Sequence, residues 1–183
     1  MIKENCFILT GAPGSGKSTL LTCLRKLGYS GIEEPARQIL EEQRLIVGAG
    51  VPEKNPCLFV DFLLSRALSR YQDAAVSDSV LFFDRGIPDN IAYASLFNLE
   101  FERGWKATEL YRYNPMVFFL PNWEAIYSHD EERKMSFQDA AKMGNHLREI
   151  YQQAGYTVVE LPFGPPEERA RFVLSALPAH VVR

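Results

Sequence analysis

A glycine-rich stretch near the beginning of the chain carries the strongest chemical signal in the sequence. Residues 11–18 read GAPGSGKS and match the phosphate-binding pattern G-x-x-x-x-G-K-[ST]. Glycines allow successive backbone N–H groups to turn inward, and with the positive end of a following helix these groups cradle phosphate oxygens. We therefore predict nucleotide binding by Gly11, Ala12, Pro13, Gly14, Ser15, Gly16, Lys17, Ser18 and Thr19.

Two side chains at the end of this loop suggest what the phosphates are used for. Lys17 can reach the β- and γ-phosphates and offset the charge that builds up during transfer. Ser18 can offer its hydroxyl oxygen to Mg²⁺, which prefers oxygen ligands. ATP and Mg²⁺ are the expected cofactors, with adenine preferred over guanine by default. The loop leaves the acceptor open among water, a sugar hydroxyl and a phosphate. A turn that only caps a helix would explain the glycines less well.

Two further polar clusters follow predicted strands. Residues 33–37 read EEPAR and residues 84–86 read DRG. In a parallel α/β sheet, ligands lie beyond the carboxyl ends of the strands, so both clusters should face the phosphates. A carboxylate there can hold Mg²⁺ through water or accept a proton from a hydroxyl, and an arginine can grip phosphate oxygens. We expect the metal at Ser18 and Asp84, and the acceptor at Glu34, Arg37 and Arg85.

Simpler explanations of these clusters stay open at this stage. Acidic residues such as Glu33 and Glu34 are favourable at any solvated helix N-terminus. Arg85 could be the structural partner of a nearby acid. Either Glu34 or Asp84 could position the acceptor hydroxyl.

The elements that would position these residues alternate along the chain. Short apolar runs alternate with segments of helical period, which indicates β-α units and a parallel sheet. About five strands are predicted, with helices on both faces. The strands cover 6–10, 29–33, 80–84, 116–121 and 156–162. The helices cover 17–27, 35–46, 56–75, an amphipathic stretch capped by Gly155, and a closing helix within 165–177.

Composition limits the class of protein. The 183 residues, 46% hydrophobic and 23% charged, suit a single domain over 1–183. A net charge of −3 argues against a general nucleic-acid binder, and no apolar run is long enough to cross a membrane. No signal peptide is recognisable. Three widely spaced cysteines indicate reduced, buried thiols, so we expect a cytoplasmic protein without a nucleic-acid or membrane partner.

Missing motifs favour phosphoryl transfer over hydrolysis. The sequence has neither the N-K-x-D guanine motif nor a D-x-x-G switch after the third strand, which argues against a Ras-like GTPase. Hydrolysing AAA+ machines usually follow the strand aspartate with a glutamate that polarises water. Here Asp84 is followed by Arg85, which stays protonated and is a poor base.

Several segments resemble known P-loop kinases. EEPAR, CLFVDFLLSRALSRYQDA and VLFFDRGIPDNIAY resemble the deoxynucleoside and thymidylate kinase group. Over nearly its full length the chain is similar to bacterial P-loop proteins with an AAA-type ATP-binding domain, through GAPGSGKST, EPAR, FFDRG, GYTVVELP and a final EER. The resemblance implies a three-layer P-loop NTPase fold with the kinase-like strand order 2-3-1-4-5.

The same resemblance implies roles for three residues. Glu34 would be the base or the partner of the acceptor hydroxyl, Asp84 the acid near Mg²⁺, and Arg85 the clamp on acceptor or phosphate. Nucleoside kinases place a glutamate before that arginine, whereas this chain has Asp84, as thymidylate kinases do. The choice of base between Glu34 and Asp84 therefore stays open.

A lid and a base pocket are also expected. The charged start of a lid-like segment, about 122–150, lies where small kinases close an arginine over the transferring phosphate and exclude water. Arg133 is the expected catalytic arginine, although such a charged run could also be a solvated surface. Phe163 could line an adenine pocket, but the plug of a hydrophobic core is the preferred interpretation. The aromatic residues of 85–114, Tyr93 among them, receive no assignment.

The leading hypothesis is a small-molecule kinase that transfers the γ-phosphoryl group of ATP to a nucleoside, nucleotide or related metabolite. Lys17, Glu34, Asp84, Arg85 and Arg133 would carry the catalysis. The alternative is an ATPase or NTPase that switches conformation for a protein partner, and a binding module without turnover fits the sequence least well. The chain could also form a homodimer.

Overall fold

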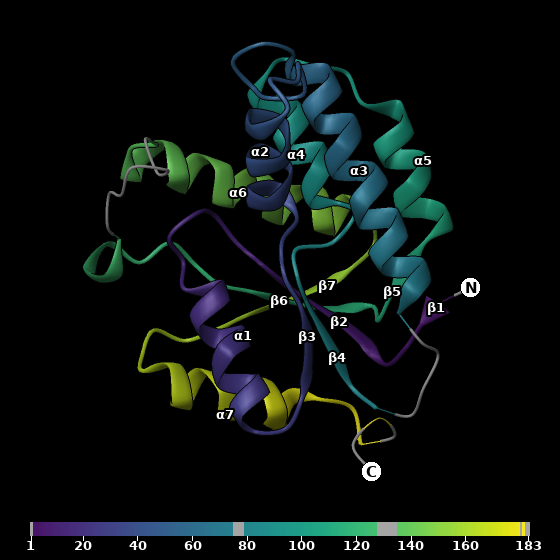
Figure 1. Cartoon of the computed structure of the whole chain (residues 1–183). Coiled ribbons are helices and arrows are strands. Elements are labelled where there is room, and N and C mark those ends of the chain that lie inside the picture. Colours follow the sequence, from purple (N-terminus) through teal and green to yellow (C-terminus); the bar gives the residue numbers. More distant parts are fainter. Residues whose placement is uncertain (1, 75–78, 128–134, 180, 182–183) are drawn as a thin grey trace.

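A five-stranded parallel sheet forms the centre of the computed structural model, which describes residues 2–74, 79–127, 135–179 and 181 (Figure 1). Along the sheet the strands follow the order β3-β4-β2-β6-β7, which in chain order is 2-3-1-4-5, as predicted. The strands are β2 (Cys6–Thr10), β3 (Ser30–Ile32), β4 (Leu81–Asp84), β6 (Met116–Phe119) and β7 (Thr157–Glu160).

Helices cover both faces of this sheet, as expected, in two groups of unequal size. On one face lie α1 (Lys17–Lys26) and α7 (Pro166–Ala176), which pack against each other. The other face carries α3 (Pro56–Asp73), α4 (Asp89–Leu96), α5 (Glu102–Leu110) and α6 (Phe137–Gln153), and α2 (Ala36–Leu45) packs on α3 (Figure 1). A short 3-10 helix, η1, spans Glu124–Ile126.

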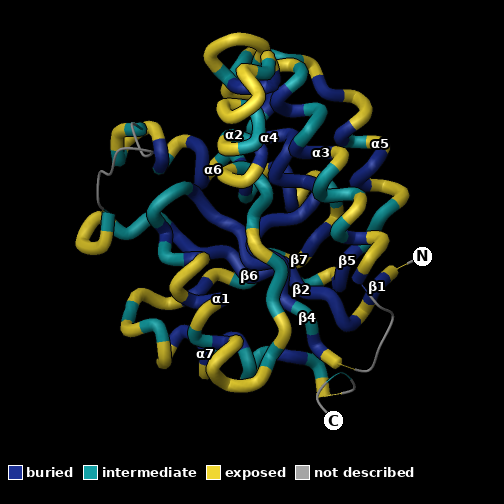
Figure 2. Tube along the Cα trace, in the orientation of Figure 1, coloured by how far each residue is buried: buried dark blue, intermediate teal, exposed yellow. Residues whose placement is uncertain are grey.

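The alternation of side chains along β2 builds a core on each side of the sheet. Successive residues of a strand point to opposite faces. Cys6 and Ile8 join the core under α3–α6, whereas Phe7 and Leu9 join the core under α1 and α7. All five residues of β2 are therefore buried, and in Figure 2 the central strands run as a buried layer between more exposed helices. This explains the uninterrupted apolar run of residues 6–9.

Local sequence signals set the ends of two helices. Asn55 caps α3, because its side-chain oxygen accepts a hydrogen bond of 3.0 Å from the N–H of Leu58. Ser136 caps α6 in the same way, by accepting the N–H of Asp139 at 3.1 Å. Gly155 follows α6 with φ 77°, so the predicted glycine cap is confirmed.

Two features of the fold depart from the prediction. The segment 85–114, for which no elements were assigned, contains α4 and α5 and a short strand, β5 (Arg112–Tyr113), which pairs in parallel with β1 (Ile2–Lys3). The three cysteines are free thiols, but only Cys6 is buried; Cys57 is exposed in the first turn of α3, so its predicted burial is wrong. Within the described ranges, the structure contains no helix with the length and apolar character needed to span a bilayer.

Candidate active site

The glycine-rich loop joins β2 to α1, as its motif requires. Gly11 has φ 144°, and a Cβ built on it would lie 2.4 Å from the carbonyl oxygen of Leu120, so only glycine fits there. Gly16 has φ 90° and begins α1. Lys17 is buried, and its Nζ donates 2.9 Å hydrogen bonds to the carbonyls of Gly11 and Ala12. The loop thus curls around its own lysine.

A cleft of about 760 Å³ opens over this loop and brings most of the predicted residues together. Its wall includes residues of the loop, residues from both polar clusters, and side chains from the segments that follow β6 and β7. The predicted residues that line it are Pro13, Gly14, Gly16, Lys17, Ser18, Thr19, Glu34, Arg37 and Arg85. Gly11, Ala12 and Ser15 are buried within the same loop.

Ser18 and Asp84 meet where α1 begins and β4 ends. The Ser18 hydroxyl donates a 3.0 Å hydrogen bond to Oδ2 of Asp84. Oδ1 of Asp84 is buried without a hydrogen-bond partner among the described residues. Burial raises the pKa of Asp84, and the charge of Lys17 offsets only part of that rise. A buried carboxylate oxygen without a partner, next to a hydroxyl oxygen, fits the donor set that Mg²⁺ prefers.

Arg85 ties the second polar cluster to the loop. Its Nε forms an ion pair of 2.8 Å with Oε1 of Glu34, and its Nη1 donates to the carbonyl of Gly11 at 3.0 Å. Its Nη1 also lies 3.0 Å from Oδ1 of Asp89. The backbone of Arg85 has φ 72°, a conformation that non-glycine residues adopt mainly where the surroundings impose it. Arg85 therefore pairs with acids and faces the cleft at once.

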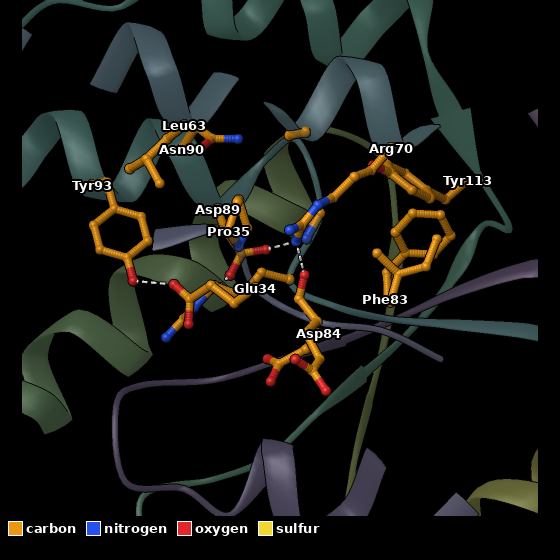
Figure 3. A pocket seen from close by; sticks show the side chains of 15 residues that line it. Glu34, Pro35, Leu63, Arg70, Phe83, Asp84, Asp89, Asn90, Tyr93 and Tyr113 are labelled. Atoms are coloured by element: carbon orange, nitrogen blue, oxygen red, sulfur yellow. Dashed lines mark hydrogen bonds and ion pairs between the residues drawn. The ribbon is translucent and has the colours of Figure 1, made fainter. Parts of the chain in front are cut away.

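Glu34 is held from two sides at the edge of the cleft. The Tyr93 hydroxyl donates a short hydrogen bond to Oε1 of Glu34, and the two side chains point toward each other in Figure 3. Burial alone would raise the pKa of Glu34, but the charges of Arg85 and Lys17 outweigh it and lower the pKa below 4.5. Glu34 is thus a fixed, charged carboxylate at neutral pH.

Lys17 lies in the same network, and its pKa is shifted as well. Burial, reinforced by the positive charge of Arg85, lowers the pKa of Lys17 from 10.5 to about 8. The carboxylates of Asp84 and Glu34 offset part of this effect. Lys17 therefore loses its proton at a lower pH than an ordinary lysine.

Asp89 is a central residue of the site that sequence reasoning missed. Its carboxylate is 1% exposed and accepts hydrogen bonds from Thr10 at 2.8 Å, from the N–H of Gly86 at 2.9 Å and from the Tyr151 hydroxyl, in addition to Arg85. Its position four residues after Arg85, in the first turn of α4, is the signal that could have found it.

A second, smaller cavity lies behind Glu34. It measures about 20 Å³, and its walls include Arg70, Asn90 and Tyr113 (Figure 3). A cavity of this size holds about one water molecule. Glu34 lines both this small cavity and the main cleft, and only the main cleft has room for a larger ligand.

Three residues from the segments after β6 and β7 remain to be compared with the sequence analysis. Arg133 lies in 128–134, outside the described residues, together with most of the charged lid-like run. Phe163 is 56% exposed and packs its ring 5.3 Å from that of Trp123, so its interpretation as a core plug is wrong. Arg169, part of the quoted EER segment but given no role, lies buried against the loop through a 3.0 Å hydrogen bond from Nη1 to the carbonyl of Ser15.

The loop, the strand order and the acidic and basic residues at the ends of β3 and β4 define a P-loop domain of the kinase-like arrangement. A family model described as an AAA domain matches residues 6–169, and the chain belongs to this family. The family resemblance found in the sequence is thereby confirmed. No curated protein matches the chain at a significant level.

Solved structures with the same fold include several small kinases. Deoxyadenosine kinase from M. mycoides superposes with a TM-score of 0.70 at 15% identity, over 94% of this chain and 98% of that chain. Thymidylate kinase from Ehrlichia chaffeensis gives 0.64 at 14%, over 94% and 98%. Shikimate kinase from Acinetobacter baumannii gives 0.56 at 14%, over 97% and 95%. At these identities the likeness shows the shared fold.

Proposed function

We propose that this protein is a small-molecule kinase that transfers the γ-phosphoryl group of Mg·ATP to a nucleoside, a nucleotide or a related metabolite. One observation carries the proposal: Glu34 and Arg85 form an ion pair in the wall of the cleft that the phosphate-binding loop lines. A site for binding alone would need the loop but not this pair. AAA+ machines that hydrolyse ATP usually carry a second acid where this chain has Arg85.

The loop side of the cleft would hold the donor nucleotide. Backbone N–H groups of the non-proline residues of 11–18, at the start of α1, would bind the phosphates, and Lys17 would balance the charge on the group in transfer. Ser18 and Asp84 would hold Mg²⁺, which would neutralise part of the charge on the phosphates. The unpartnered oxygen of Asp84 supports this assignment.

Glu34 would act on the acceptor rather than on the donor nucleotide. Asp84 is engaged by the hydroxyl of Ser18, whereas Glu34 borders both cavities and is charged at neutral pH. We assign Glu34 to orient the acceptor hydroxyl and to accept its proton, with Tyr93 and Arg85 holding the carboxylate in place. Arg37, in the first turn of α2, lines the cleft where an acceptor would enter.

The proposed class of acceptor rests on the volume of the cleft and on the structural neighbours. A cleft of about 760 Å³ has the volume of an ordinary small-molecule site. The structural neighbours named above are a deoxynucleoside kinase, a nucleotide kinase and a kinase of a hydroxylated acid, all of them enzymes of small acceptors. A lid over 122–150 with Arg133 above the phosphates, a cytoplasmic location and a homodimer stay predictions.

Radiolabelled transfer tests the proposal. The protein is incubated with γ-labelled ATP, Mg²⁺ and a panel of nucleosides, deoxynucleosides, nucleoside monophosphates and hydroxylated metabolites, and the products are separated by chromatography. We expect one class of acceptor to become labelled, and Lys17→Ala to abolish the labelling. Release of free phosphate alone, whatever is added, would contradict the kinase proposal and favour the ATPase switch, which would then show stimulation by a protein partner.

A further inference from the structure

One buried arginine beside the loop plays no part in the catalysis described so far. Arg169 lies on α7, is 3% exposed and borders the main cleft. Its Nη1 donates to the carbonyl of Ser15 at 3.0 Å, and a Cβ built on Gly16 would lie 3.0 Å from the same nitrogen. Its Nε and Nη2 are buried without hydrogen-bond partners among the described residues. The guanidinium thus touches the loop and keeps two donor groups uncommitted.

The charge of Arg169 is also uncompensated, in contrast to that of Arg85. Arg85 is paired with Glu34 and Asp89, and these acids raise its pKa despite burial. For Arg169 burial lowers the pKa, and no ion pair joins it to any acid in the described parts of the chain. An arginine stays protonated even so, and a buried charge without a partner destabilises a protein. Its position is explained if an anion supplies the missing partner.

We propose that Arg169 is a nucleotide-binding residue that provides the buried countercharge for the phosphates held by residues 11–18. This inference rests on the proposed binding of a nucleotide by that loop. The guanidinium contacts the carbonyl of Ser15 and also borders the cleft in which the phosphates would lie. Each added phosphate charge strengthens the attraction, because opposite charges in a low-dielectric site interact strongly.

A purely structural role for Arg169 makes different predictions. If Arg169 were only a structural latch, a side chain that fixes the carbonyl of Ser15, it would stabilise the protein without ligand. It would then support the binding of every ligand of the loop equally. A countercharge makes its main contribution when phosphates are bound, and this contribution grows with the number of their charges. It also leaves the empty protein with an unrelieved electrostatic cost.

The test compares three variants. Arg169→Met removes the charge and keeps a similar volume, Arg169→Lys keeps the charge, and Arg171→Met makes the same change at an exposed residue of α7. Affinities for ATP, ADP and AMP are measured by calorimetry, and melting temperatures are measured without ligand. For Arg169→Met we expect ATP to bind roughly ten- to hundredfold more weakly, with a smaller loss for ADP and the smallest for AMP.

The other expected results separate the explanations. Arg169→Lys should recover part of the lost ATP affinity, Arg171→Met should bind like the wild type, and the empty Arg169→Met protein should melt no lower than the wild type. Equal losses for the three nucleotides together with a lower melting temperature would overturn the proposal in favour of a latch. Unchanged ATP affinity in Arg169→Met would overturn this inference alone. A wild-type protein that binds no nucleotide would overturn the proposed function as well.

Discussion

The Glu34→Gln variant tests the assignment of the acid in the cleft. This substitution keeps the shape of the side chain and removes the charge that pairs with Arg85 across 2.8 Å. Arg85 retains Asp89 at 3.0 Å, so its charge does not become unpaired. The stability loss should therefore match one charge-assisted contact, about 1.5–3 kcal/mol. For a domain of this size, that loss lowers the melting temperature by about 3–12 °C.

The stability loss has a defined pH dependence. The folded pKa of Glu34 is lowered from 4.5, so its carboxylate stabilises the fold above that value and ceases to do so as the pH falls through the folded pKa. The difference in melting temperature between the wild type and Glu34→Gln should be full at pH 7 and shrink below pH 4.5. Differential scanning fluorimetry across this range measures it directly.

The effect on catalysis should be larger than the effect on stability. Removal of a group that takes up the acceptor proton typically lowers kcat by about 10²–10⁴-fold. The affinity for ATP should change little, because the loop and Ser18 hold the donor. The matched control is Glu33→Gln, at an exposed neighbour that pairs with Arg25. The assignment is refuted if Glu34→Gln keeps kcat within about threefold of the wild type, a loss far below that range.

Three further predictions concern the loop and the proposed Mg²⁺ site. Asp84→Asn should raise the Mg²⁺ concentration needed for half-maximal transfer by about tenfold or more, and an unchanged requirement in a Mg²⁺ titration would contradict the metal assignment. Gly11→Ala should abolish ATP binding measured by calorimetry, because its Cβ would collide with the Leu120 carbonyl. The control Gly28→Ala, at φ 93° in open space, should lose only stability. Equal ATP affinities of the two variants would exclude the proposed shape of the loop. At pH 8, ATP binding should take up about half a proton, because phosphates raise a Lys17 pKa that starts near 8. Calorimetry in buffers of different ionisation enthalpy measures this proton uptake. Binding without proton uptake would refute the lowered pKa of Lys17.

The parts of the fold that could be predicted are those with one dominant local signal. The buried strands appear as apolar runs because both faces of the sheet are covered, and the loop appears because its backbone tolerates only glycine at Gly11 and Gly16. In α4 such a signal is absent. Its residues Ile91, Ala92 and Ala94 are all buried, together with polar Asp89 and Asn90, so no single apolar stripe marks the helix.

The sequence predicts the placement of candidate-site residues that follow strands, but not of those held there by contacts between distant parts of the chain. Asp84 and Glu34 stand at strand ends, which the topology brings to one edge of the sheet. The contacts of Asp89 with Thr10 and of Arg169 with Ser15 join residues 79 and 154 positions apart, and no spacing in the sequence reports them. Phe163 was misjudged because an aromatic side chain after a strand can equally pack on a surface neighbour such as Trp123.

Titration of the intact protein with Mg·ATP tests the central claim most directly. We expect saturable binding of one nucleotide per chain. We also expect a strong loss of affinity in Lys17→Ala, because the wild-type lysine is held inside the loop by the carbonyls of Gly11 and Ala12. The absence of any heat of binding, or equal affinities of wild type and variant, would contradict the claim that residues 11–18 hold a polyphosphate facing Glu34 and Arg85.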